Sequence, residues 1–127
     1  MPRLLLIDDD DLVRAVLATA LTRAGHAVVQ AGDGRQGVRL FAAEPADLVI
    51  TDLVMPDREG LEVITELRRG WPEVPIIAMS GGLPRSDFYL DMAGRLGARR
   101  LLAKPFAPDV LLRAVDELLA PPAPAPR

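Results

Sequence analysis

Charged residues follow three apolar segments of the chain, and together they could bind a metal ion and a phosphoryl group. Four aspartates, Asp8–Asp11, come directly after Leu4–Ile7, and Asp52 comes directly after Leu48–Thr51. A third apolar segment ends in Lys104. Carboxylate oxygens are the ligands that hard divalent cations prefer, and an ammonium group pairs with phosphate. These residue types therefore predict cation and phosphate chemistry, provided that the fold brings them together.

The alternation of short apolar runs with segments of helical periodicity predicts five βα units. The predicted strands are Leu4–Ile7, His26–Gln30, Leu48–Thr51, Val74–Met79 and Arg99–Ala103. Apolar residues at helical spacing mark helices within 13–24, 38–42, 61–67, 87–96 and 110–119. Because the strands are continuously apolar, we expect a parallel sheet buried on both faces, in a doubly wound α/β fold.

The composition indicates the class of protein and its cellular location. The chain has 127 residues, half of them apolar, a net charge of −3 and no cysteine. We expect one domain over 1–120, no direct nucleic-acid partner, no disulfide and no membrane span, and therefore a cytoplasmic protein. The Pro-rich segment 121–127 is expected to be a frayed tail or the start of a linker, and Met1 just before the first strand favours a stand-alone protein.

Three of the carboxylates are expected to meet at one edge of the sheet. If the strand order is 2-1-3-4-5, the first and third strands are neighbours, and ligands bind where the strand order reverses. Asp8, Asp9 and Asp52 would then crowd together, and a magnesium ion would offset their repulsion. For Asp10 and Asp11 we expect helix capping instead, and for Asp8 and Asp9 both interpretations stay open.

Three further residues could complete such a site. Lys104 is the only lysine of the chain, and because it precedes a proline it should stay extended at its strand end, although a surface lysine is the alternative. Ser80 ends the fourth strand and could donate a hydrogen bond to a phosphoryl oxygen, or be an ordinary loop serine. Gly60 is expected where the backbone needs freedom or a close approach.

Taken in order, these residues resemble the receiver domain of two-component response regulators, over about Pro2 to Ala120. The matching residues are Asp8-Asp9, Asp52 with Met55-Pro56, Gly60, Ser80 and Lys104-Pro105-Phe106. The resemblance implies a (βα)5 flavodoxin-like fold with a five-stranded parallel sheet in the order 2-1-3-4-5. It also implies phosphorelay signalling by a protein that is not a true enzyme but catalyses its own phosphorylation and dephosphorylation.

The resemblance also implies roles and partners. The implied phosphoacceptor is Asp52. Asp9, Asp52 and the Val54 carbonyl would bind Mg²⁺ (Mn²⁺ is possible), with Asp8 assisting through water. Ser80 and Lys104 would contact the phosphoryl group. The implied phosphodonor is a sensor histidine kinase or a histidine phosphotransfer protein. The output is an unidentified downstream protein, and the protein is expected to be a monomer or a phosphorylation-dependent dimer.

Two departures from the family pattern concern the switch. Family members usually carry Tyr or Phe three residues before the lysine, where this chain has Leu101, and the segment 81–86 looks longer than usual. Phe88 and Tyr89 could replace the missing aromatic or contact a partner, and at least one of them is expected to pack against the core.

Two other functions remain alternatives. A pseudo-receiver would bind partners without being phosphorylated, which the absence of the aromatic at Leu101 would allow. A small phosphatase of the haloacid-dehalogenase type would use Asp8 as nucleophile and Asp10 as acid/base, but Asp11-Leu12 does not match the residues that usually follow.

Overall fold

We describe a computed structural model that covers residues 1–53, 60–81 and 86–120. The predictions for the Val54 carbonyl, for Met55-Pro56, for the segment after Gly81 and for the Pro-rich tail therefore fall outside the described residues. No helix in the described ranges is long and apolar enough to cross a membrane.

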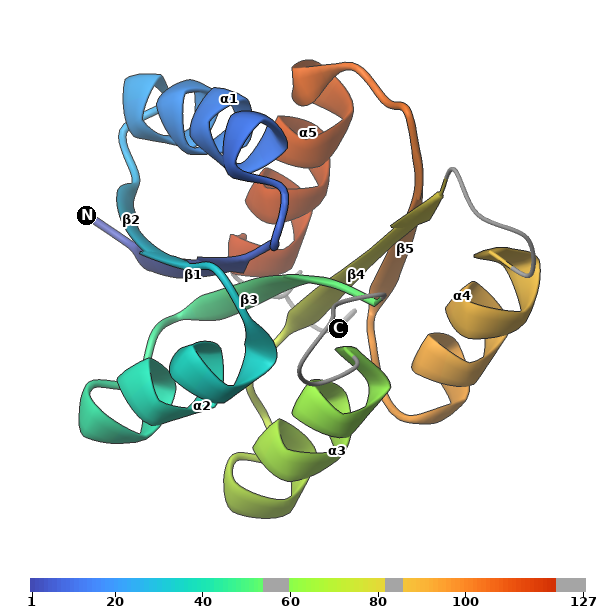
Figure 1. Cartoon of the computed structure of the whole chain (residues 1–127). Helices are drawn as coiled ribbons and strands as arrows, with labels where there is room; N and C mark the ends of the chain where they lie inside the picture. The colour runs from blue at the N-terminus through green and yellow to red at the C-terminus, as the bar shows by residue number, and fades with distance from the viewer. Residues whose placement is uncertain (54–59, 82–85, 121–127) are drawn as a thin grey trace, which may run out of the picture.

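Five parallel strands form one sheet in the order β2-β1-β3-β4-β5 (Figure 1). The strands are β1 (Arg3–Ile7), β2 (Ala27–Ala31), β3 (Leu48–Asp52), β4 (Ile76–Gly81) and β5 (Arg100–Lys104). β1 pairs with both β2 and β3, so the strand order reverses between β1 and β3. The predicted order is confirmed, and the reversal point is where such sheets bind ligands.

Helices cover both faces of the sheet. They are α1 (Asp11–Arg23), α2 (Gly34–Ala43), α3 (Gly60–Gly70), α4 (Ser86–Arg95) and α5 (Pro108–Leu119). α1 and α5 lie on one face, and α2, α3 and α4 lie on the other (Figure 1). Each layer of helices closes its own hydrophobic core, so the predicted doubly wound flavodoxin-like fold is confirmed.

Local sequence signals set the ends of the first helix. Asp10 is the N-cap of α1, and its side chain accepts hydrogen bonds from the backbone N–H groups of Leu12 and Val13. Gly25 follows the helix with a φ of 100°, a conformation that favours glycine. The expected capping role of Asp10 is therefore confirmed.

Burial on both faces holds for the central strands but is wrong for both edge strands, since β2 is mostly half-buried and β5 is more exposed still. β1, β3 and β4 are almost completely buried, whereas β5 alternates between exposed and half-buried residues. Leu101 is 42% exposed, and Ala103 is exposed as well. The reason is position: β5 pairs only with β4, so solvent reaches its free side.

The apolar face predicted for α1 is also only partly buried. Leu17, Ala18 and Leu21 are buried against the sheet. Val16, which helical periodicity places on the apolar face of this helix, is 50% exposed, and Leu12, one turn earlier, is 75% exposed. These two residues are four apart and therefore share the outward side of the helix.

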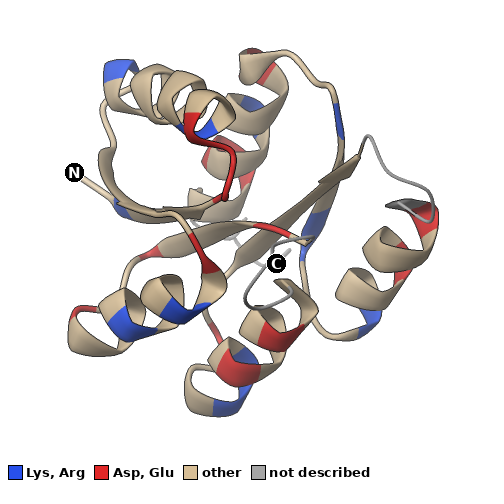
Figure 2. Ribbon diagram, in the orientation of Figure 1, with Lys and Arg blue, Asp and Glu red and all other residues tan. Residues whose placement is uncertain are grey.

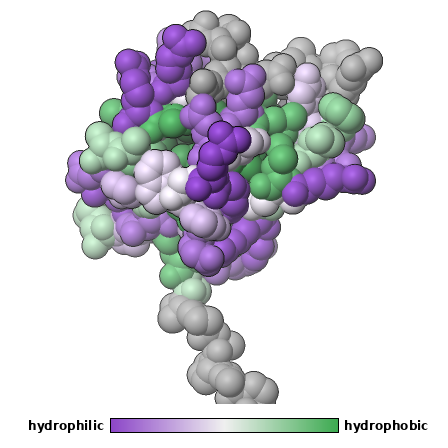
Figure 3. Space-filling model, turned by 90° about the horizontal axis from the view of Figure 1, so that it is seen from below, coloured by the Kyte–Doolittle hydropathy of each residue, from purple (hydrophilic) through white to green (hydrophobic). Residues whose placement is uncertain are grey.

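Charge and hydropathy are distributed unevenly over the surface. Acidic segments lie on the β1–α1 loop and near the end of β3, close to one another in space (Figure 2). On the face seen from below, the described residues form both hydrophilic and hydrophobic areas (Figure 3). The acidic segments on the β1–α1 loop and near the end of β3 are therefore a candidate functional site.

Candidate metal and phosphoryl site

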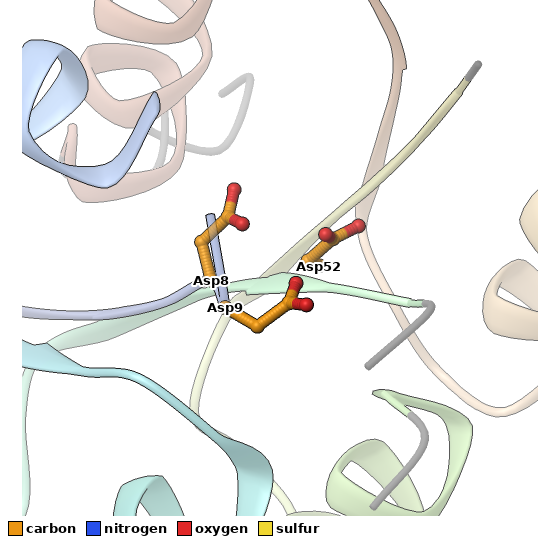
Figure 4. A group of neighbouring side chains, drawn as sticks. All are labelled: Asp8, Asp9 and Asp52. Atoms are coloured by element: carbon orange, nitrogen blue, oxygen red, sulfur yellow. The ribbon is translucent and has the colours of Figure 1, made fainter. Parts of the chain in front are cut away.

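Three carboxylates meet at the C-terminal ends of β1 and β3 (Figure 4). Asp8 is fully buried, Asp52 is 8% exposed and Asp9 is exposed. One carboxylate oxygen from each lies within 4.8 Å of the others. The sequence prediction that these three side chains come together is therefore confirmed, although they are far apart in the chain.

Lys104 reaches the same site from the end of β5. Its Nζ donates to Asp8 Oδ2 over 2.9 Å and lies 3.3 Å from Asp52 Oδ2. The lysine backbone passes close to Gly81 of β4, where a Cβ would lie 2.5 Å from the Lys104 carbonyl oxygen. Glycine at position 81 thus permits the close approach that brings the ammonium group over the two aspartates.

The electrostatics leave an excess of negative charge. The pKa of Asp52 is raised to about 6, chiefly because burial disfavours the charged carboxylate; the Lys104 charge opposes this rise and the neighbouring Asp8 adds to it. Burial alone would lower the pKa of Lys104, but its hydrogen bond to Asp8 and the charges of both aspartates outweigh it and raise that pKa. One ammonium group therefore does not neutralise three carboxylates.

The residues present fit a hard divalent cation. The donor set consists of carboxylate oxygens, one of them exposed and within reach of solvent, which matches the oxygen ligands and retained water that Mg²⁺ prefers. Capping of α1 is supplied by Asp10. Asp8 Oδ1 instead accepts from the backbone N–H of Asp10 over 2.9 Å, which leaves Oδ2 facing Lys104.

The structure also places Ser80 and Gly60 at this edge. Ser80 is 2% exposed, lies one residue before the end of β4 and pairs with Ala103, the residue before Lys104. A Cβ on Gly60 would lie only 2.2 Å from the carbonyl oxygen of Asp52. The expected close approach at Gly60 is therefore present, and any larger side chain there would push on the strand end that carries Asp52.

Two groups that support the site, the Arg14 side chain and the Leu53 backbone N–H, were not predicted from the sequence. Arg14 of α1 donates from Nη1 to the Asp8 carbonyl over 2.7 Å and from Nη2 to Asp11 over 2.7 Å, which braces the β1–α1 loop. The backbone N–H of Leu53 donates to Asp52 Oδ1 over 2.9 Å. The spacing of Asp11 and Arg14 on one helix could have suggested the ion pair between them, but no pattern indicates the contact to the Asp8 carbonyl or the one from the Leu53 N–H.

The switch and interface candidates lie on α4 and β5. Leu101 lies against α4, since a Cβ on Gly94 would be 3.4 Å from Leu101 Cδ1. Tyr89 packs against the core beneath α4, as expected of at least one of the two aromatics, whereas Phe88 is 54% exposed and meets Tyr89 edge-on at 5.7 Å. The three side chains thus contribute to the α4–β5 side of the molecule.

Comparison with curated proteins shows the relatives of this chain. It is 36% identical over 124 residues to the transcriptional regulatory protein GlrR of Escherichia coli, covering 96% of this chain and 27% of that protein. It is also 36% identical over 118 residues to AfsQ1 of Streptomyces coelicolor, covering 91% of this chain and 51% of that regulator. The chain thus spans about a quarter to a half of the length of these relatives.

Two solved structures match this chain over nearly their whole length. The chemotaxis protein CheY4 of Vibrio cholerae superposes with a TM-score of 0.83 at 28% identity, covering 94% of this chain and 99% of that one. TrrA of Thermotoga maritima, solved in complex with Mg²⁺ and BeF, superposes with a TM-score of 0.84 at 31% identity, covering 94% and 100%. The model of the response regulator receiver domain matches residues 4–116, and the chain therefore belongs to this family, the phosphorylation-dependent signalling domains of two-component systems.

Proposed function

We propose that Asp52 accepts the phosphoryl group, that Asp8, Asp9 and the Val54 carbonyl join it in holding Mg²⁺, and that residues 1–120 form the receiver domain. The observation that carries this proposal is the position of Asp52: its carboxylate shares one small site with two other aspartates and Lys104. Such a site needs a cation when all three carboxylates are ionised, and a bound Mg²⁺ would stabilise negative charge on a phosphoryl oxygen.

The remaining side chains position the reacting groups. Asp52 Oδ2 faces Lys104, whereas Oδ1 is held by the Leu53 backbone N–H, so the carboxylate has a fixed orientation for in-line attack on phosphorus. Lys104 neutralises charge on one phosphoryl oxygen, and Ser80 donates its hydroxyl to another. A water molecule in line with the acyl phosphate later hydrolyses it, so the domain supports both its phosphorylation and its dephosphorylation.

The donor and the output follow from this chemistry. Receiver domains as a family interact with histidine kinases or phosphotransfer proteins and with downstream targets, and we propose a phosphohistidine of such a protein as the donor. Phosphorylation would redirect Lys104 from the aspartates to the phosphoryl group, and because β5 carries both Lys104 and Leu101, the change can reach the α4–β5 surface.

The positions of Asp8 and Asp10 argue against the small-phosphatase alternative. Asp8 is fully buried, whereas Asp52 is 8% exposed, so a phosphate ester in solvent has no access to the Asp8 carboxylate. The Asp10 carboxylate is engaged as the cap of α1. A pseudo-receiver would have no need for the intact set of three carboxylates and one lysine.

Phosphoryl transfer from a phosphohistidine protein tests the proposal. Wild-type protein should gain one hydroxylamine-labile phosphoryl group in Mg²⁺ and none in EDTA, Asp52→Asn should gain none in either, and Asp9→Asn should respond weakly to Mg²⁺. Ala42→Gln, an exposed position on α2 away from the site, is the control. Phosphate on any residue other than Asp52 would refute the assignment.

A further inference from the structure

Arg14 of α1 ties the loop after β1 to two neighbouring segments. Its side chain is only 18% exposed and donates three hydrogen bonds from one guanidinium group. Nη1 donates to the Asp8 carbonyl over 2.7 Å, Nη2 to Asp11 Oδ1 over 2.7 Å, and Nε to Gln30 Oε1 over 3.3 Å. Because a guanidinium group is planar and its donors are fixed relative to one another, these bonds hold the β1–α1 loop, the start of α1 and β2 in one arrangement.

The peptide group that Arg14 holds joins two of the proposed metal ligands, Asp8 and Asp9. A peptide group is planar, so a hydrogen bond to its oxygen also restricts the direction in which the next side chain leaves the backbone. Asp8 is fixed on its other side as well, since its N–H donates to the Ala31 carbonyl over 3.1 Å. Asp9 is exposed, and in the described part of the chain its carboxylate has no hydrogen bond or ion pair. The direction of Asp9 toward Asp52 (Figure 4) therefore depends on backbone restraints, and the bond from Arg14 lies directly beside it.

The charge of Arg14 and its hydrogen bonds predict opposite effects on metal binding. The guanidinium group is packed against the chain just after β2, since a Cβ on Gly32 would lie 3.4 Å from Arg14 Nη1. Part of its charge is offset by Asp11, with which it forms an ion pair. The remaining positive charge would repel a nearby divalent cation, so charge alone predicts that Arg14 weakens Mg²⁺ binding. Positioning of Asp9 predicts that Arg14 strengthens it, and the two roles therefore differ in the sign of the effect.

We infer that Arg14 is a positioning residue of the metal site: by holding the peptide between Asp8 and Asp9 it keeps the Asp9 carboxylate directed at Asp52, and it thereby strengthens the binding of Mg²⁺. The inference rests on the proposed function and adds to it a residue outside the proposed ligand set. Groups that orient metal ligands in this way typically change the metal affinity by about 10- to 100-fold. We expect about tenfold for Arg14, because it orients one carboxylate of three and Asp8 keeps its bond to Ala31 without it.

A Mg²⁺ titration followed in the backbone amide NMR spectrum of the full chain tests the inference, with the dissociation constant taken from the Asp52 amide. Arg14→Met keeps an unbranched side chain but removes all three hydrogen bonds, so it should raise the dissociation constant about tenfold. Arg14→Lys keeps the charge and one donor group and should give an intermediate value. Arg95→Met is the matched control and should leave the constant unchanged, because Arg95 is 74% exposed and also forms an ion pair with an acidic residue of its own helix, Asp91.

A second variant makes the test independent of the stability of Arg14→Met. Gln30 is exposed on β2, and Gln30→Ala removes a neutral partner of the guanidinium group, so it should raise the dissociation constant by a smaller factor. Tighter Mg²⁺ binding in Arg14→Met would overturn the inference while leaving Asp52 as acceptor. A dissociation constant equal to that of the wild type, with only the free energy of unfolding lowered, would overturn it too, because a merely structural role predicts that result. The absence of Mg²⁺-dependent shifts at Asp52 in the wild-type protein would instead refute the proposed function itself.

Discussion

Asp52→Asn should stabilise the Mg²⁺-free protein at neutral pH, because the ionised carboxylate is costly in its buried position. The pKa of Asp52 is raised from 3.8 to about 6, and the side chain is only 12% exposed, so solvent screens it little. At about 1.4 kcal/mol per pKa unit, ionisation at pH 7 costs about 3 kcal/mol of folding stability. We expect the variant to gain about 2–3 kcal/mol in urea unfolding with EDTA present.

The pH dependence has a definite sign. The folded state binds the Asp52 proton more tightly than the unfolded state, so the stabilisation by the protonated form is complete below about 3.8 and is lost as the pH rises through about 6. The advantage of Asn should therefore be large at pH 7 and absent near pH 4. The control is Asp91→Asn, which removes an exposed ion pair with Arg95 and should change stability by less than about 0.5 kcal/mol.

The reasoning would be refuted by an Asp52→Asn variant that is less stable than wild type at pH 7. A gain of the same size at every pH would refute it as well, because the effect would then not come from ionisation of the carboxylate.

Three further predictions concern the same site. Lys104→Met should lower the free energy of unfolding in urea at pH 7 by about 2–4 kcal/mol, because Asp8 and Asp52 would lose their only cationic partner among the described residues. Addition of Mg²⁺ should restore part of this loss. Gly60→Ala should lower the free energy of unfolding by about 1–3 kcal/mol, because its Cβ would collide with the Asp52 carbonyl. Gly70→Ala is the control and should not destabilise the protein, since there is open space around its Cβ. Equal stabilities of the two variants would contradict the contact at Gly60. Mg²⁺ affinity, measured by titration calorimetry, should fall as the pH drops below about 6, since protons compete for Asp52; a constant affinity down to pH 5 would exclude Asp52 as a ligand.

Much of this architecture could be predicted because the signals are local and repeated. Each apolar run with a charged residue at its end identified a strand and the direction in which it delivers that residue, and helical periodicity filled the intervals. Given the strand order, the meeting of Asp8, Asp9 and Asp52 followed from geometry. Asp10 could be separated from its neighbours only in the structure, where its side chain accepts the N–H groups of α1.

What could not be predicted depends on which neighbour covers a surface. Periodicity places Val16 and Leu17 near one another on α1 but does not reveal that Val16 lies beyond the edge of the covered face. The apolar composition of β5 likewise does not show that it is an edge strand with Leu101 exposed. The contact from Arg14 to the Asp8 carbonyl involves a backbone atom, so side-chain types carry no signal for it.

The central claim is that Asp52 accepts a phosphoryl group in a site completed by Mg²⁺. Its most direct test is the backbone amide NMR spectrum with Mg²⁺, before and after addition of beryllofluoride as a phosphoryl mimic. We predict shifts at Asp9, Asp52, Ser80 and Lys104, absent in Asp52→Asn; their spread to Leu101 and α4 would show that the switch works without the aromatic residue. An unchanged spectrum in the presence of both Mg²⁺ and beryllofluoride would contradict the account.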